Sequence, residues 1–116
     1  MKVKGNSSPL LAGALLFALS GLTPAHAAAD AAAAQDLMKS NKCTKCHAPD
    51  KDKTGPSLKS IAAKYKGKAD GEDKVVKAMT TGPKVKLDDG TQEEHMIIKT
   101  KDAAHLKNLA QWILSN

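Results

Sequence analysis

Five consecutive residues, Cys43-Thr44-Lys45-Cys46-His47, contain the only two cysteines of the chain, with a histidine directly behind them. Two thiols and an imidazole at this spacing support three different chemistries. They can form a thiol–disulfide pair, supply part of a zinc site, or attach a haem. The interpretation of the rest of the sequence depends on which of these applies.

Two of the three chemistries fit the sequence poorly. A disulfide between residues three positions apart closes a very small loop and constrains the unfolded chain little. A structural zinc ion takes four ligands, so the distant His95 or His105 would have to complete a set of three crowded into the motif. A thioredoxin-like thiol pair normally lies beside a βαβ pattern, and the sequence shows no strand-like alternation.

C-x-x-C-H is the pattern for attaching a c-type haem. Cys43 and Cys46 lie about one helical turn apart, so each sulfur can reach one vinyl group of the porphyrin. His47 follows directly and places its imidazole under the iron. The motif therefore predicts one haem c bound covalently through Cys43 and Cys46. The zinc site and the thiol pair are the alternatives.

Residues 1–27 have the layout of a secretory signal peptide. Lys2 and Lys4 precede an apolar stretch from Leu10 to Leu19, and small residues surround an A-x-A pattern at 25–27. The apolar stretch is shorter than the roughly 20 residues that a permanent membrane span needs. We expect cleavage after Ala27, which leaves one small domain over residues 28–116 in the periplasm. Covalent haem attachment and export are consistent with one another.

The elements that would position the motif read as helices. Asp30 or Asp36 can stabilise the start of the first, Ser57 can cap the second, and Thr100 or Asp102 can cap the last. The apolar spacing is clearest in the last helix, where it follows i, i+3, i+4, i+7 and i+8. The predicted helices span 28–41, 57–65, 72–83 and 101–116.

The remaining segments read as loops. Residues 48–56 have two prolines, a glycine and alternating charge, and residues 84–100 lack a sustained helical period. Asp89-Gly90 predicts a tight turn in the second of these segments. Only Tyr65 and Trp112 remain as aromatic residues after leader removal, which suggests that a cofactor fills part of the core. The predicted fold class is all-α, with about four helices around one haem.

The sequence resembles the small class I bacterial cytochromes c, which are monohaem electron carriers of the periplasm. The resemblance is carried by "DLMKSNKCTKCHAPD", "TGPSLKSIAAKYKGK" and "LAQWILSN", and it covers essentially all of residues 28–116. It implies the class I fold and a role for Pro56, whose carbonyl accepts a hydrogen bond from the second ring nitrogen of His47. Relatives often hold the haem propionates with an arginine, and this chain has none. Lys84, Lys86 or backbone amides are the available substitutes.

The sixth iron ligand has several candidates: Met38, Met79, His95, Met96 and His105. Met38 and Met79 lie on apolar helix faces and read as core residues, and His105 reads as a partly exposed helix residue. The resemblance places the axial methionine in the irregular segment before the last helix, so Met96 is the predicted ligand together with His47. His95 is the alternative, because Ile97 stands where relatives usually have proline.

These ligands imply a one-electron carrier rather than an enzyme, because His/Met ligation leaves the iron no open position. Removal of Lys2 and Lys4 with the leader leaves 16 lysines against 12 acidic residues, a formal charge of +4. Lysines near the motif favour redox partners with acidic docking surfaces, although a solvated surface explains them equally well. We expect a monomer that binds no nucleic acid and does not insert stably into the membrane. The alternatives are a dedicated subunit of an enzyme complex and a ligand-binding haem sensor.

Overall fold

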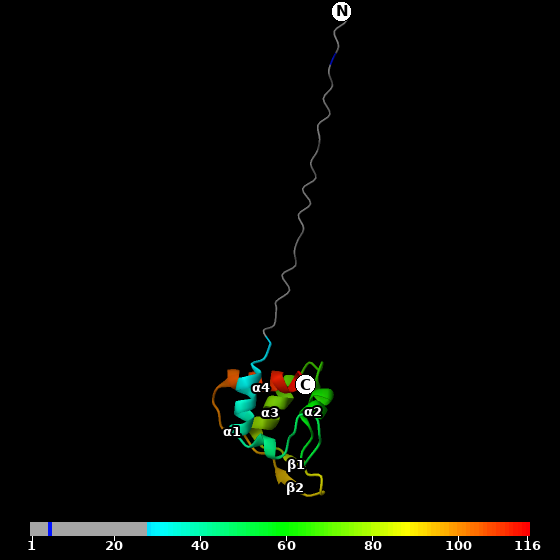
Figure 1. The fold of residues 1–116 in the computed structure, drawn as a ribbon, viewed down its shortest axis with the longest axis vertical. Coiled ribbons are helices and arrows are strands. Elements are labelled where there is room, and N and C mark those ends of the chain that lie inside the picture. Colours follow the sequence, from blue (N-terminus) through cyan, green and yellow to red (C-terminus); the bar gives the residue numbers. More distant parts are fainter. Residues whose placement is uncertain (1–4, 6–27) are drawn as a thin grey trace, which may run out of the picture.

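The computed structural model describes residue 5 and residues 28–116. The leader and cleavage site expected at 1–27 lie, apart from Gly5, outside the described residues. Within the described part, the chain forms four α-helices, a short 3₁₀ helix and a small hairpin (Figure 1). This confirms the prediction of a mostly helical fold. The elements are α1 (Ala31–Ser40), η1 (Cys43–Lys45), α2 (Leu58–Tyr65), α3 (Gly71–Thr81), β1 (Lys84–Lys86), β2 (Gln92–Glu94) and α4 (Ala103–Leu114).

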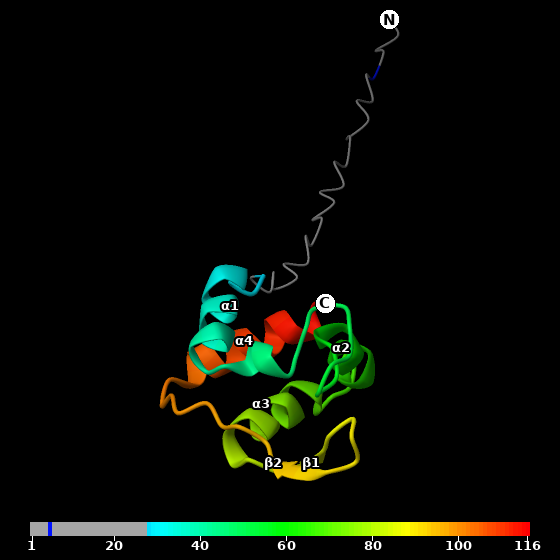
Figure 2. The same ribbon diagram turned by 60° about the horizontal axis from the view of Figure 1, so that its bottom comes forward.

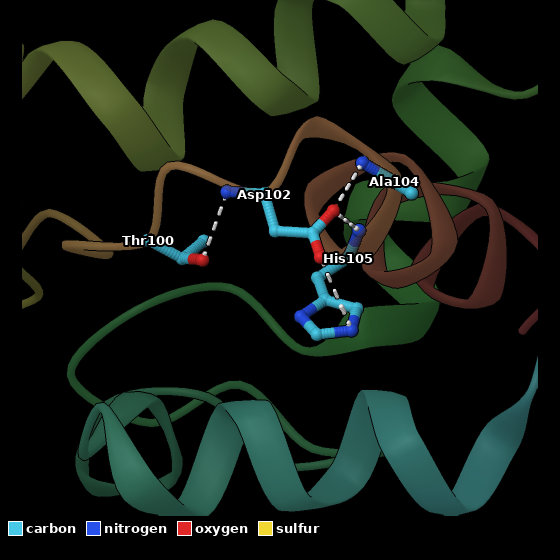
Figure 3. A network of polar contacts seen from close by, with 4 residues as sticks. All are labelled: Thr100, Asp102, Ala104 and His105. Atoms are coloured by element: carbon cyan, nitrogen blue, oxygen red, sulfur yellow. Dashed lines mark hydrogen bonds and ion pairs between the residues drawn. The ribbon is translucent and has the colours of Figure 1, made fainter.

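Three of the four α-helices begin at a side-chain cap. The Asp30 carboxylate accepts from the Ala33 amide at 3.0 Å, and the Ser57 hydroxyl accepts from the Ser60 amide at 3.0 Å. At the start of α4, the Asp102 carboxylate accepts from the amides of Ala104 and His105, at 2.9 and 3.3 Å (Figure 3). Each cap satisfies backbone donors that have no partner within the helix, and is worth about 1 kcal/mol.

Helix α4 lies at the centre of the fold, and α1, α2 and α3 each pack against it (Figure 2). Leu109 and Ala110 of α4 are completely buried. The start of α1 is fixed to α4 by two reciprocal bonds, from the Asp30 amide to Asn108 Oδ1 at 2.7 Å and from Asn108 Nδ2 to the Asp30 carbonyl at 2.9 Å. The other buried apolar residues are Ala34, Met38, Leu58, Ala62, Val75, Met79, Ile98, Leu106 and Ile113.

The segment between α3 and α4 contains a hairpin that the sequence did not predict. Strands β1 and β2 are antiparallel with Val85 opposite Glu93, and they lie at the end of the domain away from the C-terminus (Figures 1 and 2). Asp89 Oδ1 accepts from the Thr91 amide at 2.8 Å, and Gly90 has a φ of +86°, as the predicted tight turn requires. Each strand has only three residues, too few to show a two-residue period in the sequence.

Among residues 28–116, none of the helices combines the length and apolar character that crossing a membrane requires.

Candidate haem-binding site

The C-x-x-C-H motif forms a single tight turn after α1. The chain reverses at Lys42, which adopts a left-handed conformation with a φ of +60°. The carbonyl of Cys43 then accepts from the amides of Cys46 and His47, at 3.2 and 3.0 Å. This one-turn helical geometry places the side chains of Cys43 and Cys46 on the same side. The two sulfurs are half-buried and are not joined in a disulfide, as attachment to two points of one macrocycle requires.

The environment of Cys43 does not favour thiol–disulfide chemistry. The pKa of the Cys43 thiol is raised above its ordinary value. Burial is the main cause, a backbone hydrogen bond partly opposes it, and the nearby Cys46 raises the pKa further. The thiolate is the reactive form in disulfide exchange, and catalytic cysteines have lowered pKa values. A thiol oxidoreductase is therefore poorly supported at this position.

The His47 imidazole is held in the tautomer that a metal ligand needs. Its Nδ1 lies 2.6 Å from the Pro56 carbonyl oxygen. A carbonyl can only accept, so Nδ1 carries the proton and Nε2 keeps its lone pair. The pKa of His47 is lowered from its ordinary value. Burial is the main cause, the hydrogen bond to Pro56 opposes it, and the neighbouring His95 lowers the pKa further. His47 is thus neutral near pH 7, the form that binds metals.

A set of backbone bonds positions the Pro56 carbonyl against His47. The Gly55 amide donates to the Cys46 carbonyl at 3.0 Å, and the Leu58 amide donates to the Ala48 carbonyl at 2.9 Å. Asp52, which no sequence pattern indicated as part of the site, accepts from the Ser57 amide at 2.7 Å and from the Ser60 hydroxyl at 2.9 Å. The loop over residues 48–56 is therefore an ordered part of the site.

The segment after β2 brings His95 close to His47. The ring centroids of the two histidines are 6.0 Å apart, with an angle of 45° between the planes. His95 Nδ1 is buried and has no hydrogen-bond partner among the described residues. Met96 belongs to the same segment, but its side chain is 54% exposed. The structure thus groups Cys43, Cys46, His47 and Pro56, and adds His95.

The other residues weighed as iron ligands lie where the sequence predicted. Met38 and Met79 are buried in the core, at 4% and 7% exposure. His105 is an exposed residue of α4, and its Nε2 lies 3.6 Å from Asp102 Oδ2 (Figure 3). Among the described residues, no group of three or more histidine, cysteine, aspartate or glutamate side chains could hold a metal ion. The zinc alternative therefore has no support in this part of the chain.

The donor set at the turn fits a c-type haem. Two free thiols on one side of a helical turn can form thioethers, and the neutral His47 presents a free Nε2 next to them. The partner that fixes the tautomer of His47 is a backbone carbonyl, as is common for metal-ligating histidines. The unpartnered nitrogen of His95 supplies a further donor on a neighbouring segment.

Comparison with known proteins agrees with this assignment. The family model for cytochrome c matches residues 31–116. The chain is 36% identical over 100 residues to cytochrome c-552 of Nitrosomonas europaea. This match covers 85% of this chain and 90% of that protein. It is 30% identical over 82 residues to cytochrome c-551 of Azotobacter vinelandii, with coverages of 71% and 95%.

A solved structure, the class 1 cytochrome MtoD from Sideroxydans lithotrophicus ES-1, matches with a TM-score of 0.73 and 49% identity. The match covers 76% of this chain and 97% of that one. The chain therefore belongs to the cytochrome c family, as a small class I cytochrome c with one haem c bound covalently through Cys43 and Cys46.

Proposed function

We propose that the protein is a periplasmic one-electron carrier whose haem iron is coordinated by His47 and Met96. In this proposal residues 1–27 direct export and are removed, and residues 28–116 form the carrier. The family carries electrons by means of haem. The observation that supports the proposal most directly is the turn at Cys43–His47, in which the His47 tautomer is fixed by Pro56 at 2.6 Å.

Each residue of the site has a separate task in this function. Cys43 and Cys46 keep the cofactor attached outside the cytoplasm, because thioether bonds do not dissociate. Pro56 holds the His47 ring in one orientation, and Met96 supplies a thioether, which raises the reduction potential of haem iron. The haem supplies a reversible change of one electron. With His47 and Met96 both holding the iron, no position would remain open for a substrate, and the protein would transfer electrons without catalysing changes in bonds.

The partners that fit this carrier are redox proteins with acidic docking surfaces. Four exposed lysines lie in the motif or close to it on either side: Lys42, Lys45, Lys51 and Lys53. Positive charge around the site would increase the rate of encounter with an acidic partner and leave the complex short-lived. A monomer that docks transiently is the arrangement that we propose.

The experiment that tests this function is visible and near-infrared spectroscopy of the haem-loaded protein, oxidised and reduced, with a redox titration. We expect a fully reversible one-electron transition and a charge-transfer band from a methionine thioether to ferric iron. Met96→Leu, a substitution of similar volume, should lose that band. A wild-type protein without a reversible one-electron transition would contradict the proposal.

The second candidate function applies if Met96 does not hold the iron. An open position on the iron would then bind a diatomic gas. The protein would then be a ligand-binding haem sensor. Addition of carbon monoxide to the reduced wild type separates the two functions. A carrier does not change its spectrum, whereas a sensor forms the carbon monoxide complex readily.

A further inference from the structure

His95 is a histidine for which the proposed His47/Met96 site has no use. Its side chain is partly buried, its Nδ1 is fully buried, and no hydrogen bond satisfies that nitrogen among the described residues. A buried polar atom without a partner costs on the order of 1–3 kcal/mol. Such an atom is unusual in a folded protein and commonly indicates a functional role.

The backbone around His95 is fixed from both sides. Its amide donates to the Pro83 carbonyl at 2.9 Å, and the Ile98 amide donates to the Met79 carbonyl at 2.8 Å. Gly82 lies so close that a Cβ added there would approach the His95 carbonyl oxygen to 3.2 Å. The segment over residues 95–98 is therefore fastened to the C-terminal end of α3, and the position of His95 is built into the fold.

The distance between His95 and His47 suits two ligands of one metal ion. Two metal–imidazole bonds of about 2 Å each, with about 1 Å from each ligating nitrogen to its ring centre, span about 6 Å. The observed separation of the ring centroids is 6.0 Å. Met96 is the next residue along the chain. The Nδ1 of His95 is buried, whereas the side chain of Met96 is 54% exposed.

We propose that His95 is a second ligand for the axial position that faces His47, in competition with Met96. This proposal rests on the proposed function. The carrier then has two forms, one coordinated by His47 and Met96 and one by His47 and His95. One coordination position accepts one donor atom, so the two residues cannot occupy it together. The backbone hydrogen bonds of His95 to Pro83 and of Ile98 to Met79 stay in place, and rotation of the side chains of His95 and Met96 exchanges one for the other.

The exchange is balanced without an added reactant. The bond to the Met96 sulfur breaks, the bond to a neutral imidazole nitrogen of His95 forms, and no electron or proton has to be transferred. Ligand chemistry gives the two forms different preferences. The thioether is a soft donor that favours the ferrous state, and imidazole is a harder nitrogen donor that is better suited to the ferric state. The His47/His95 form should therefore be enriched on oxidation.

Four haem-loaded variants test the proposal: Met96→Leu, His95→Ala, the double variant, and His105→Ala as a matched control. His105 is an exposed histidine of α4 beside Asp102. Electron paramagnetic resonance of the ferric proteins reports the axial ligands, and carbon monoxide binding to the ferrous proteins reports an open position. Neither readout depends on electron-transfer activity.

If His95 is a ligand, ferric Met96→Leu is low-spin with a bis-imidazole signal, and the double variant loses that signal and binds carbon monoxide faster. A Met96→Leu protein that is high-spin and binds carbon monoxide as fast as the double variant would overturn the proposal. If Met96→Leu does not retain haem, His95→Ala decides. If the charge-transfer band of the thioether is stronger in His95→Ala than in the wild type and in His105→Ala, competition between His95 and Met96 is supported. A band of unchanged strength in His95→Ala overturns the proposal.

Failure of this proposal can be told apart from failure of the proposed function. A wild type that is reduced reversibly by one electron, with Met96→Leu identical to the double variant, overturns the role of His95 alone. A wild type without a reversible one-electron transition overturns the proposed function itself.

Discussion

The imidazole of His47 is bound at its Nδ1 by the Pro56 carbonyl, and its Cε1 and Nδ1 atoms lie close to Gly55. A Cβ added at Gly55 would lie 3.0 Å from His47 Cε1 and 3.3 Å from Nδ1. We therefore expect Gly55→Ala to displace the ring, with a cost of about 1–3 kcal/mol from overpacking. The measurement is the free energy of unfolding of the haem-loaded protein, together with its ferric near-infrared spectrum.

Gly90→Ala is the control for this change. A Cβ at Gly90 would meet no atom within 4 Å, but the residue has a φ of +86°, so it should lose stability through backbone strain alone. Its near-infrared spectrum should match that of the wild type. Equal spectra for Gly55→Ala and Gly90→Ala would show that Gly55 does not position His47.

Asp52 links the loop that carries Pro56 to the start of α2. Hydrogen bonds from the Ser57 amide, the Ser60 hydroxyl and the Ser57 hydroxyl, in that order, lower the pKa of the Asp52 carboxyl. A lowered pKa in the folded state means that the unfolded chain binds more protons in acid. The stabilisation is therefore present above the ordinary carboxyl pKa of about 4 and is lost as the pH falls through the folded-state value.

Asp52→Asn should make the acid loss of stability less steep, because Asn keeps an acceptor but does not titrate. The free energy of unfolding by denaturant, followed from about pH 7 to about pH 3, measures this dependence. Asp50→Asn, at the neighbouring exposed carboxylate, controls for the loss of one negative charge. If both variants follow the wild-type curve, the bonds to Asp52 do not contribute to acid stability.

The junction between α2 and α3 depends on Gly71, the first residue of α3. A Cβ at this position would overlap the backbone carbonyl oxygen of Tyr65, the last residue of α2. Gly71→Ala must therefore separate the two helices, and we expect it to cost about 3 kcal/mol or more. In a domain of this size, each 1 kcal/mol lowers Tm by roughly 4–8 °C.

Gly67→Ala is the matched comparison within the same connection. A Cβ there would meet nothing within 4 Å, and only the φ of +76° opposes it. Thermal unfolding of both variants should show the larger fall in Tm for Gly71→Ala. A fall that is no larger than that of Gly67→Ala would mean that the helices separate at little cost.

The helices could be predicted from the sequence because their signals are local. Ser57 and Asp102 cap the helices that they were expected to cap, and the apolar spacing of the last helix matches its buried residues. The hairpin was missed because strands of three residues show no period. Its stability comes from pairing between residues 84–86 and 92–94, which the sequence of either segment alone does not reveal.

The site was predictable to a different degree at each residue. Cys43, Cys46 and His47 follow from a motif whose spacing is set by the chemistry of attachment. The contact of Pro56 with His47 depends on the fold of residues 48–56, and only the family resemblance suggested it. The nearness of His95 to His47 depends on how the hairpin ends, and no local pattern indicated it.

At the scale of the whole molecule, the excess of lysine should act where electrons enter and leave. A charge that only keeps the protein soluble would affect encounter equally from any position, whereas a docking charge acts near the haem edge. Lys45 and Lys51 are exposed in or just after the motif, and Lys64 and Lys107 are exposed on α2 and α4. Reversal of either pair to glutamate changes the net charge by the same amount.

We expect Lys45→Glu/Lys51→Glu to slow oxidation of the ferrous protein by ferricyanide, a small anion, by about 3-fold to 10-fold at low salt. Lys64→Glu/Lys107→Glu should have a smaller effect. Stopped-flow rates at increasing ionic strength measure both, and the difference should shrink as the screening length falls to about 8 Å near physiological salt. Equal losses in the two double variants would assign the effect to net charge, and the lysines near the motif would then form a solvated surface rather than a docking site.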